Sequence, residues 1–403
     1  MERRSETGRG GSVAEVALAF LRLGLTAFGG PAAHLGYFRE ALVRRRGWTD
    51  EAGYADLVAL CQFLPGPASS QVAFALGLIR AGGLLGGLAA WAAFSLPSLA
   101  LMTAFAAGAG ALGGPHGAAL LHGLKLAAVA VVAEAVRGMA RSLAPDRTRA
   151  TIAVAALAAT ALAPGSGGQV AAIALGAAAG LALCREPATG EGTRAPVPVS
   201  RRAGALALAL FALLLVGAGP LAEALGAHML AVCAAFYRAG ALVFGGGHVV
   251  LPLLRAAVVD PGWVEPGAFL AGYGAAQAVP GPLFSLAAYL GAVLRPGPGG
   301  IAGAALAFAA LSLPGLLVVY GALPFWGRLA ARADARAALR GANAAVVGIL
   351  AAALYDPVFT AAVGNARDLA LAAACFMLLA VWRTPPWCVV ALAALGGLAL
   401  AGG

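Results

Sequence analysis

The sequence has 403 residues, of which 61% are hydrophobic and 11% are charged, and it carries a formal net charge of +10. Soluble domains average about 25% charged residues, so this composition excludes an ordinary soluble protein. Long apolar runs recur along the whole chain, which indicates membrane-spanning α-helices rather than barrel strands. The basic residues are nearly all arginines in short loops, where they set orientation in a bilayer and do not indicate nucleic-acid binding.

The apolar segments follow one another with short polar connections, apart from a longer linker at residues 185–202. Several are shorter than the ~20 residues that a straight span needs, so the number of crossings stays open. In chain order, the expected segments are 13–38, 54–79, 83–107, 117–139, 149–163, 168–184, 203–219, 228–250, 268–294, 298–324, 339–355, 366–382 and 386–402.

The two halves of the chain share a set of motifs in the same order and at the same spacing. Those of the first half are Arg22, Phe28-Gly29-Gly30, Trp48, Gln62, Pro65-Gly66-Pro67, Ser70 and Ser95-Leu96-Pro97. They recur 215 to 217 positions later as Arg238, Phe244-Gly245-Gly246, Trp263, Gln277, Pro280-Gly281-Pro282, Ser285 and Ser312-Leu313-Pro314. This indicates a duplication, with a first repeat at 1–184, a connecting region with one unpaired helix at 185–227, and a second repeat at 228–403.

The second repeat is expected to have the opposite orientation to the first. Segment 203–219 has no counterpart in the first half, and one extra crossing between two like repeats inverts the second. Loop charges agree, because arginines follow segment 117–139 but precede the equivalent segment 339–355. By the positive-inside rule the N-terminus is cytoplasmic. The predicted fold is an all-α polytopic membrane protein with two inverted-topology repeats and broken or re-entrant helices at the centre.

Each repeat contains two interruptions inside apolar runs. Pro-Gly-Pro cannot continue a helix, and a broken helix persists in lipid only where protein or a polar cavity satisfies the freed backbone groups. If 13–38 turns back at Gly29-Gly30-Pro31 and 54–79 re-enters at Pro65-Gly66-Pro67, the basic N-terminal arm and Arg44, Arg45 and Arg46 all stay in the cytoplasm. Whether these two segments span or re-enter stays open.

Matching breaks in two halves of a chain indicate a transporter's binding site. A helix restarting after Pro67 leaves the N–H groups of Ala68, Ser69 and Ser70 without intrahelical partners, which favours an anion. The alternative is a pair of packing kinks with small residues at helix crossings. The residues predicted to bind the anion at the breaks are Gly29, Gly30, His34, Gln62, Gly66, Ser69, Ser70, Gly245, Gly246, His248, Gln277, Gly281 and Ser285.

Charged residues at membrane depth complete the predicted site. A charge at the bilayer centre costs about 2.5–3.5 kcal/mol even on the most lenient scale, which favours a functional role for Arg22, Arg238 and Lys125 as anion ligands and for Glu134 in proton handling. The alternatives are snorkelling to the interface for Arg22 and pairing with other helices for Lys125 and Glu134.

The sequence lacks the motifs of an enzyme or a nucleotide-driven pump. It has no Walker loop, no nucleophile elbow and no His-Glu-x-x-His, and its five cysteines form no Cys-x-x-Cys pair. We therefore predict no catalytic residues, no cofactor and no metal.

The motif set resembles the chromate ion transporter family in its long, two-domain form. The resemblance is carried by Phe28-Gly29-Gly30-Pro31-x-x-His34, Trp48, Pro65-Gly66-Pro67 and Ser95-Leu96-Pro97-Ser98, and by the second-half motifs, where Gly247 replaces Pro31. It implies export of chromate across the bacterial cytoplasmic (inner) membrane, with resistance to chromate. The implied partners are a small oxyanion, with sulfate as a competitor, and the lipid bilayer. A homodimer is one option for the assembly. Alternatives are a transporter of sulfate or another anion in either direction, and a membrane protein without transport activity.

Overall fold

The computed structural model describes residues 11–109, 114–185, 198–330 and 332–401, and within these ranges the regular structure is entirely helical. The first half comprises α1 (Val13–Thr26), α2 (Gly30–Phe38), α3 (Glu51–Phe63), α4 (Ala68–Ala81), α5 (Leu84–Ala109), α6 (Gly114–Leu143), α7 (Arg147–Leu162) and α8 (Ser166–Leu183). The second half comprises α9 (Arg201–Leu225), α10 (His228–Ala241), α11 (Val250–Val258), α12 (Pro266–Ala276), α13 (Leu286–Val293), α14 (Gly300–Ala322), α15 (Trp326–Ala330), α16 (Ala333–Ala353), α17 (Thr360–Ala362), α18 (Ala366–Ala380) and α19 (Pro386–Ala401).

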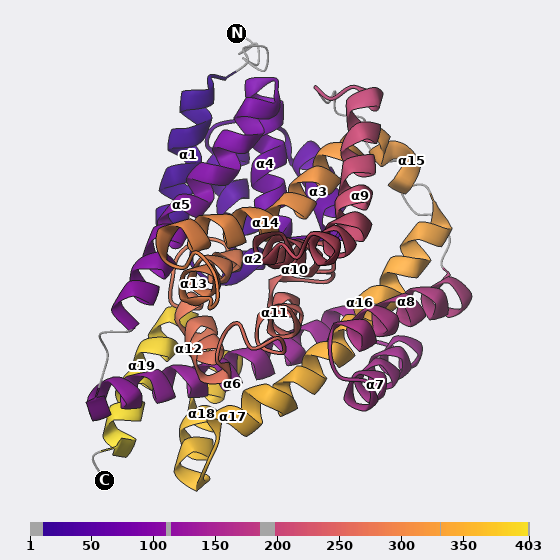
Figure 1. The fold of residues 1–403 in the computed structure, drawn as a ribbon. Helices are drawn as coiled ribbons and strands as arrows, with labels where there is room; N and C mark the ends of the chain where they lie inside the picture. The colour runs from indigo at the N-terminus through magenta and orange to yellow at the C-terminus, as the bar shows by residue number, and fades with distance from the viewer. Residues whose placement is uncertain (1–10, 110–113, 186–197, 331, 402–403) are drawn as a thin grey trace.

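Some of these helices are long and apolar enough to cross a membrane. Among the described residues, six stretches qualify: α5, α6, α8, α9, Gly300–Phe325 and Ala333–Ala362. The predicted class, a polytopic helical membrane protein, is therefore confirmed. Helix α9, which has no counterpart in the first half, stands at the edge of the molecule in Figure 1 and exposes Leu206, Leu213 and Val216.

Four of the predicted segments are broken, at the positions that the sequence indicates. Segment 13–38 forms α1 and α2, 54–79 forms α3 and α4, 228–250 forms α10 and α11, and 268–294 forms α12 and α13. Glycines carry the breaks because their φ angles lie in the left-handed region, at 99° for Gly29, 120° for Gly66, 143° for Gly246 and 98° for Gly281. Pro67 is the residue before α4 rather than its first helical residue.

The breaks of the two repeats are hydrogen-bonded to each other. Gly66 N–H donates to the Val243 carbonyl at 2.7 Å, and Gly281 N–H donates to the Ala27 carbonyl at 2.9 Å. Gly66 and Gly281 are repeat equivalents, and so are Ala27 and Val243. Each Pro-Gly-Pro therefore contacts the Gly-rich break of the other repeat, and such reciprocal pairing is what a two-fold relation between like units generates.

The last two helices of each repeat pack on the long helix of the other repeat. Helices α7 and α8 lie against α16, whereas α18 and α19 lie against α6. The contacts are close because glycines face each other: Gly341 of α16 meets the backbone of Gly176 and Gly180, and Gly123 of α6 meets the backbone of Ala393 in α19. The two repeats are thus interlocked in space and are not separate packed bodies.

Adding one methyl group at Gly341 is expected to weaken this interlock. In Gly341→Ala the new Cβ would overlap the backbone of Gly176, and overpacking typically costs about 1–3 kcal/mol. The control is Gly138→Ala in α6, where an added Cβ meets nothing within 4 Å. Thermal unfolding in detergent should show a lower midpoint for Gly341→Ala and an unchanged or higher one for Gly138→Ala; equal midpoints would contradict the close packing.

Candidate functional site

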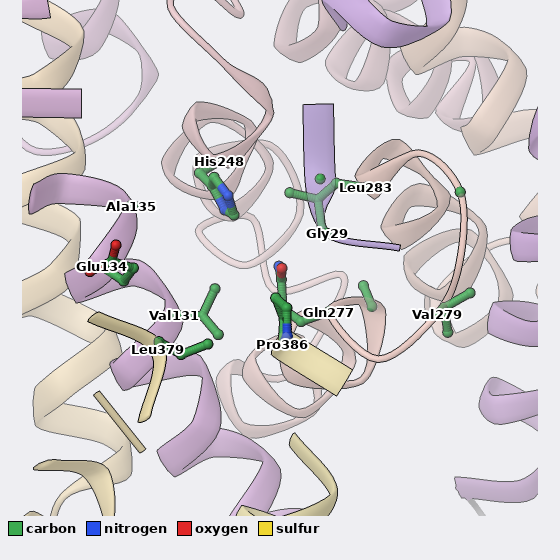
Figure 2. A pocket seen from close by; sticks show the side chains of 13 residues that line it. Gly29, Val131, Glu134, Ala135, His248, Gln277, Val279, Leu283, Leu379 and Pro386 are labelled. Atoms are coloured by element: carbon green, nitrogen blue, oxygen red, sulfur yellow. The ribbon is translucent and has the colours of Figure 1, made fainter. Parts of the chain in front are cut away.

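A cavity of about 190 Å³ lies where breaks from both repeats meet. Its walls come from the α1–α2 break, from α6, from the short helix η2 (Gly247–Val249), from the α12–α13 break and from the facing ends of α18 and α19. Figure 2 shows Gln277 in the middle of the view, with Glu134 on one side and Gly29 and Leu283 on the other. The apolar part of the lining consists of Val131, Ala135, Ala276, Val279, Leu283, Leu379 and Pro386.

Six of the residues predicted from the sequence lie around this cavity. Gly29 and Gly30 come from the break of the first repeat, Gln277 and Gly281 come from the second Pro-Gly-Pro break, and Glu134 and His248 come from α6 and η2. Residues that are far apart in the chain thus meet because the breaks of the two repeats are hydrogen-bonded to each other.

Gln277 gives the cavity a hydrogen-bond donor. It follows the last residue of α12, and its Nε2 atom is buried and has no hydrogen-bond partner within the described ranges. Buried polar atoms in folded proteins nearly always have a partner, and an amide NH₂ group can only donate. The atom therefore needs an acceptor, such as an oxygen of an anion or of water.

Glu134 forms a two-pronged ion pair with Arg137, three residues further along α6. Arg137 Nε donates to Oε2 at 2.6 Å and Nη2 donates to Oε1 at 2.6 Å. Both side chains are about one-third exposed, at 29% for Glu134 and 31% for Arg137. While the pair is formed it neutralises the carboxylate, so the acid does not present a free negative charge to an anion in the cavity. Protonation of Glu134 would release the guanidinium.

His248 is held in place from behind the cavity. Its Nδ1 atom is hydrogen-bonded to the hydroxyl of Tyr273 at 2.9 Å, and Tyr273 is fully buried. This bond fixes the ring and leaves its other edge available to the cavity. The imidazole thus supplies a second oriented polar group beside Gln277.

The first Pro-Gly-Pro break does not line the cavity because its own chain fills the space beside it. The amide of Gln71 donates to the Pro65 carbonyl at 2.8 Å and to the Gly315 carbonyl at 3.1 Å. A Cβ at Gly66 would lie 2.8 Å from Gln71 Nε2. The repeat equivalent of Gln71 is Leu286, which cannot make these bonds. The break at Pro65-Gly66-Pro67 is thus closed, whereas the one at Pro280-Gly281-Pro282 borders the cavity.

The structure places the two predicted arginine ligands away from the cavity. Arg22 is exposed on α1, on the same face as the exposed residues Leu18 and Leu25. Arg238 is exposed on α10, with its guanidinium beside Gly219 of α9. Both positions are repeat equivalents, and both face outward from the bundle.

The other predicted residues are also not part of the cavity wall. Lys125 approaches Gly267 at the start of α12, and His34 is buried against the ring of Phe94. Gln62 is exposed near the end of α3. The remaining predicted residues are packed near the breaks but outside the cavity wall. Ser69, Ser70 and Ser285 are buried, and Gly66 lies against Gly315. Gly245 lies against Leu143, and Gly246 is the next residue along the chain.

Sequence reasoning missed Arg137 as a site residue, as well as the apolar part of the wall. The signal for Arg137 was present, since an arginine three residues after a glutamate on an apolar helix predicts an ion pair. No sequence signal pointed to Leu379 or Pro386, because they reach the cavity through the exchange of α18 and α19 between repeats. Within the described residues, no group of three or more His, Cys, Asp or Glu side chains is arranged to hold a metal ion.

A helical membrane protein in which helix breaks from two repeats border a small cavity with a few polar groups has the architecture of a transporter. The comparison with known proteins agrees. The chromate transporter family model matches residues 14–184 and again residues 230–398, so the chain belongs to the chromate transporter family.

Curated relatives match over most of the chain. A chromate transport protein of Pseudomonas aeruginosa is 33% identical over 84% of this chain and 79% of its own length. A probable chromate transport protein of Synechococcus elongatus is 28% identical over 85% of this chain and 84% of its own. A chromate transport protein of Cupriavidus metallidurans is 28% identical over 84% of this chain and 81% of its own length. No solved structure matches the chain.

Replacing Gln71 tests whether it closes the first break. Gln71→Leu removes the donor to the Pro65 carbonyl, which lies outside any helix, and the second bond to the Gly315 carbonyl of α14; a buried carbonyl left unsatisfied costs about 1–3 kcal/mol. We expect a lower midpoint of thermal unfolding in detergent. Gln62→Leu serves as the control, because Gln62 is exposed. If both variants unfold at the wild-type temperature, the Gln71 amide does not support the break.

Proposed function

We propose that this protein is a secondary transporter that exports chromate, a tetrahedral dianion, across the bacterial cytoplasmic membrane and so confers resistance. The observation that carries the proposal is the cavity between the repeats, with the unpartnered Gln277 amide in its wall. The names of the three relatives support chromate as the substrate. The cytoplasmic N-terminus that the loop arginines predict is part of the proposal.

The direction of transport follows from charge. Moving one elementary charge through 100 mV is worth about 2.3 kcal/mol, so a dianion leaving an inside-negative cell gains about twice that amount. Export is therefore electrically downhill, whereas import would need coupling to another gradient.

The ligands of the anion are proposed from the cavity wall. Gln277 supplies its NH₂ group, and Leu283, which lines the cavity directly after Pro282, supplies its backbone N–H group, which has no intrahelical partner in the first turn. The amide of Gly281 is not among the donors, because it is already bonded to Ala27. His248 completes the set from η2.

Glu134 and Arg137 are proposed to couple the anion to a proton. With Glu134 ionised, Arg137 is bound in the ion pair and cannot attract the anion. A proton on Glu134 breaks the pair and frees a guanidinium within one helical turn of the cavity. The repeat equivalents are Ala352 and Tyr355, so this function belongs to one repeat only.

The two repeat-related glutamines give a matched test of the substrate site. Gln277→Leu removes the cavity donor, and a hydrogen bond to a charged group is worth about 1.5–3 kcal/mol. Cells that express this variant should therefore retain about ten times as much radiolabelled chromate as wild-type cells, or more. Gln62→Leu removes an exposed glutamine outside the cavity and should keep export intact. Equal export by both variants, at equal protein levels in the membrane, would refute the site.

Proteoliposome flux tests the substrate and the coupling. Wild-type protein should move chromate faster when a pH gradient is imposed, and Glu134→Gln should lose that acceleration because the guanidinium is then permanently released. Preferred transport of sulfate would favour the alternative substrate, and the absence of flux of either anion would reject transport altogether.

A further inference from the structure

A second cavity, of about 390 Å³, lies between α7, α8, α11 and the end of α16. Its wall on α16 is formed by Ile349, Ala352 and Ala353. These residues stand 218 positions after Val131, Glu134 and Ala135, which line the first cavity. The same interval separates Gly123 from Gly341, the glycines at the two equivalent crossings.

One further position in the wall follows the same relation. Gln169 of α8 lines the second cavity and is the repeat equivalent of Pro386, which lines the first. The equivalence of Gln169 and Pro386 follows from the helix crossings. Gly176 of α8 contacts Gly341, and Ala393 of α19 contacts Gly123, so α8 and α19 are aligned at the same sequence interval. The second cavity therefore shares with the first the equivalent wall of the long helix and one position on the helix packed against it, whereas its wall on α11 has no counterpart around the first cavity.

Gln169 presents an acceptor to the second cavity. Its side chain is 94% buried, since Gln169 is only 6% exposed, and its Nε2 atom donates to the Pro252 carbonyl at 3.2 Å. That bond fixes the orientation of the amide. The Oε1 atom is then left buried with no hydrogen-bond partner among the residues described, so it needs a donor from whatever occupies the cavity.

Arg255 presents a charged donor to the same cavity. It lies one turn after Pro252 on α11, and its Nε atom is buried without a partner in the described part of the chain. Its Nη1 atom lies 3.4 Å from the carboxylate of Asp260, so the ion pair uses one end of the guanidinium and leaves the Nε–H free. This N–H needs an acceptor.

The remaining polar groups around the cavity do not meet these two needs. Thr160 of α7 already donates its hydroxyl to Ala156. Asp356 is exposed at the rim and accepts from Thr360 at 3.2 Å, and Tyr355 is exposed as well. The buried interior of the cavity is therefore defined by one cationic donor and one neutral acceptor.

We propose that this second cavity binds the singly protonated form of the oxyanion, hydrogen chromate, whose oxygens accept from Arg255 and whose hydroxyl donates to Gln169. The proposal rests on the proposed function. A fully deprotonated dianion offers acceptors only and would leave Gln169 Oε1 unsatisfied and facing negative oxygens. A metal cation would meet the guanidinium instead and would be repelled.

The pair of cavities then discriminates between anions of equal shape. Hydrogen sulfate is a much stronger acid than hydrogen chromate, so near neutral pH sulfate carries no proton and chromate does in part. The first cavity offers the unpartnered NH₂ group of Gln277, a donor that can hold either dianion. An acceptor that requires a proton from the ligand holds chromate and not sulfate.

Binding of radiolabelled chromate to the purified full-length protein in detergent tests the proposal. Wild-type protein should show two classes of site at mildly acidic pH, of which only one is displaced by excess sulfate; the sulfate-resistant class should disappear at mildly alkaline pH. Arg255→Gln and Gln169→Leu should each lower the affinity of the sulfate-resistant class by about tenfold or more. Gln277→Leu should affect only the sulfate-sensitive class.

The control is Arg332→Gln, which removes an exposed arginine paired with Asp334 at 3.7 Å and should leave both classes unchanged. Each variant is checked for an unaltered unfolding midpoint before binding is compared. If sulfate displaces all bound chromate at every pH, or if both cavity variants bind as the wild type does, the second site is overturned while the proposed function stands. If no protein binds chromate at all, the proposed function fails first.

Discussion

The structure depends on one requirement, that the backbone groups freed where a membrane helix breaks must be hydrogen-bonded inside the protein. Here each repeat meets that requirement for the other. Gly66 donates to Val243 and Gly281 donates to Ala27, so a Pro-Gly-Pro break in one half is completed by a Gly-rich break in the other. Within the first repeat, Gln71 adds a bond to the Pro65 carbonyl of its own break. The site therefore forms at the one place where both halves are needed.

Duplication alone would give two equal sites, and single substitutions have made them different. Gln71 fills the space beside the first Pro-Gly-Pro, where Leu286 stands in the second repeat. Glu134 faces the first cavity, where Ala352 faces the second. Each change exchanges a polar side chain for an apolar one at a fixed backbone position. The two halves thus differ in the side chains at equivalent positions while the backbone relation between them is kept.

The sequence was sufficient to predict the breaks, because proline and glycine act on the backbone locally. It was also sufficient to predict the repeat, because the spacing of motifs can be read directly along the chain. It also predicted Gln277, Gly281 and Glu134 as cavity residues. The exchange of α18 and α19 between repeats was not predictable, since these helices are largely apolar and their sequence does not say which neighbour a glycine meets or that Asp368 of α18 pairs with His122 of α6. Arg22 lies on the outer face of α1, opposite the buried Phe20 and Leu23, and the cost of a charge at membrane depth does not by itself indicate which way the side chain faces.

Two hydrophobic cores meet beside the first cavity, and this arrangement bears on how access to the cavity can change. One core joins α1 to α5 with the end of α14, and the other joins α6 to α8 with α10 to α13, most of α14, α16, α18 and α19. Gly29 and Gly30 approach the cavity from the first core, whereas α6, α12 and α19 approach it from the second. The two glycine hydrogen bonds cross this boundary. Helices α5 and α14 cross it as well, because each contributes side chains to both cores. A relative movement of the two cores therefore has to change main-chain hydrogen bonds and side-chain packing together.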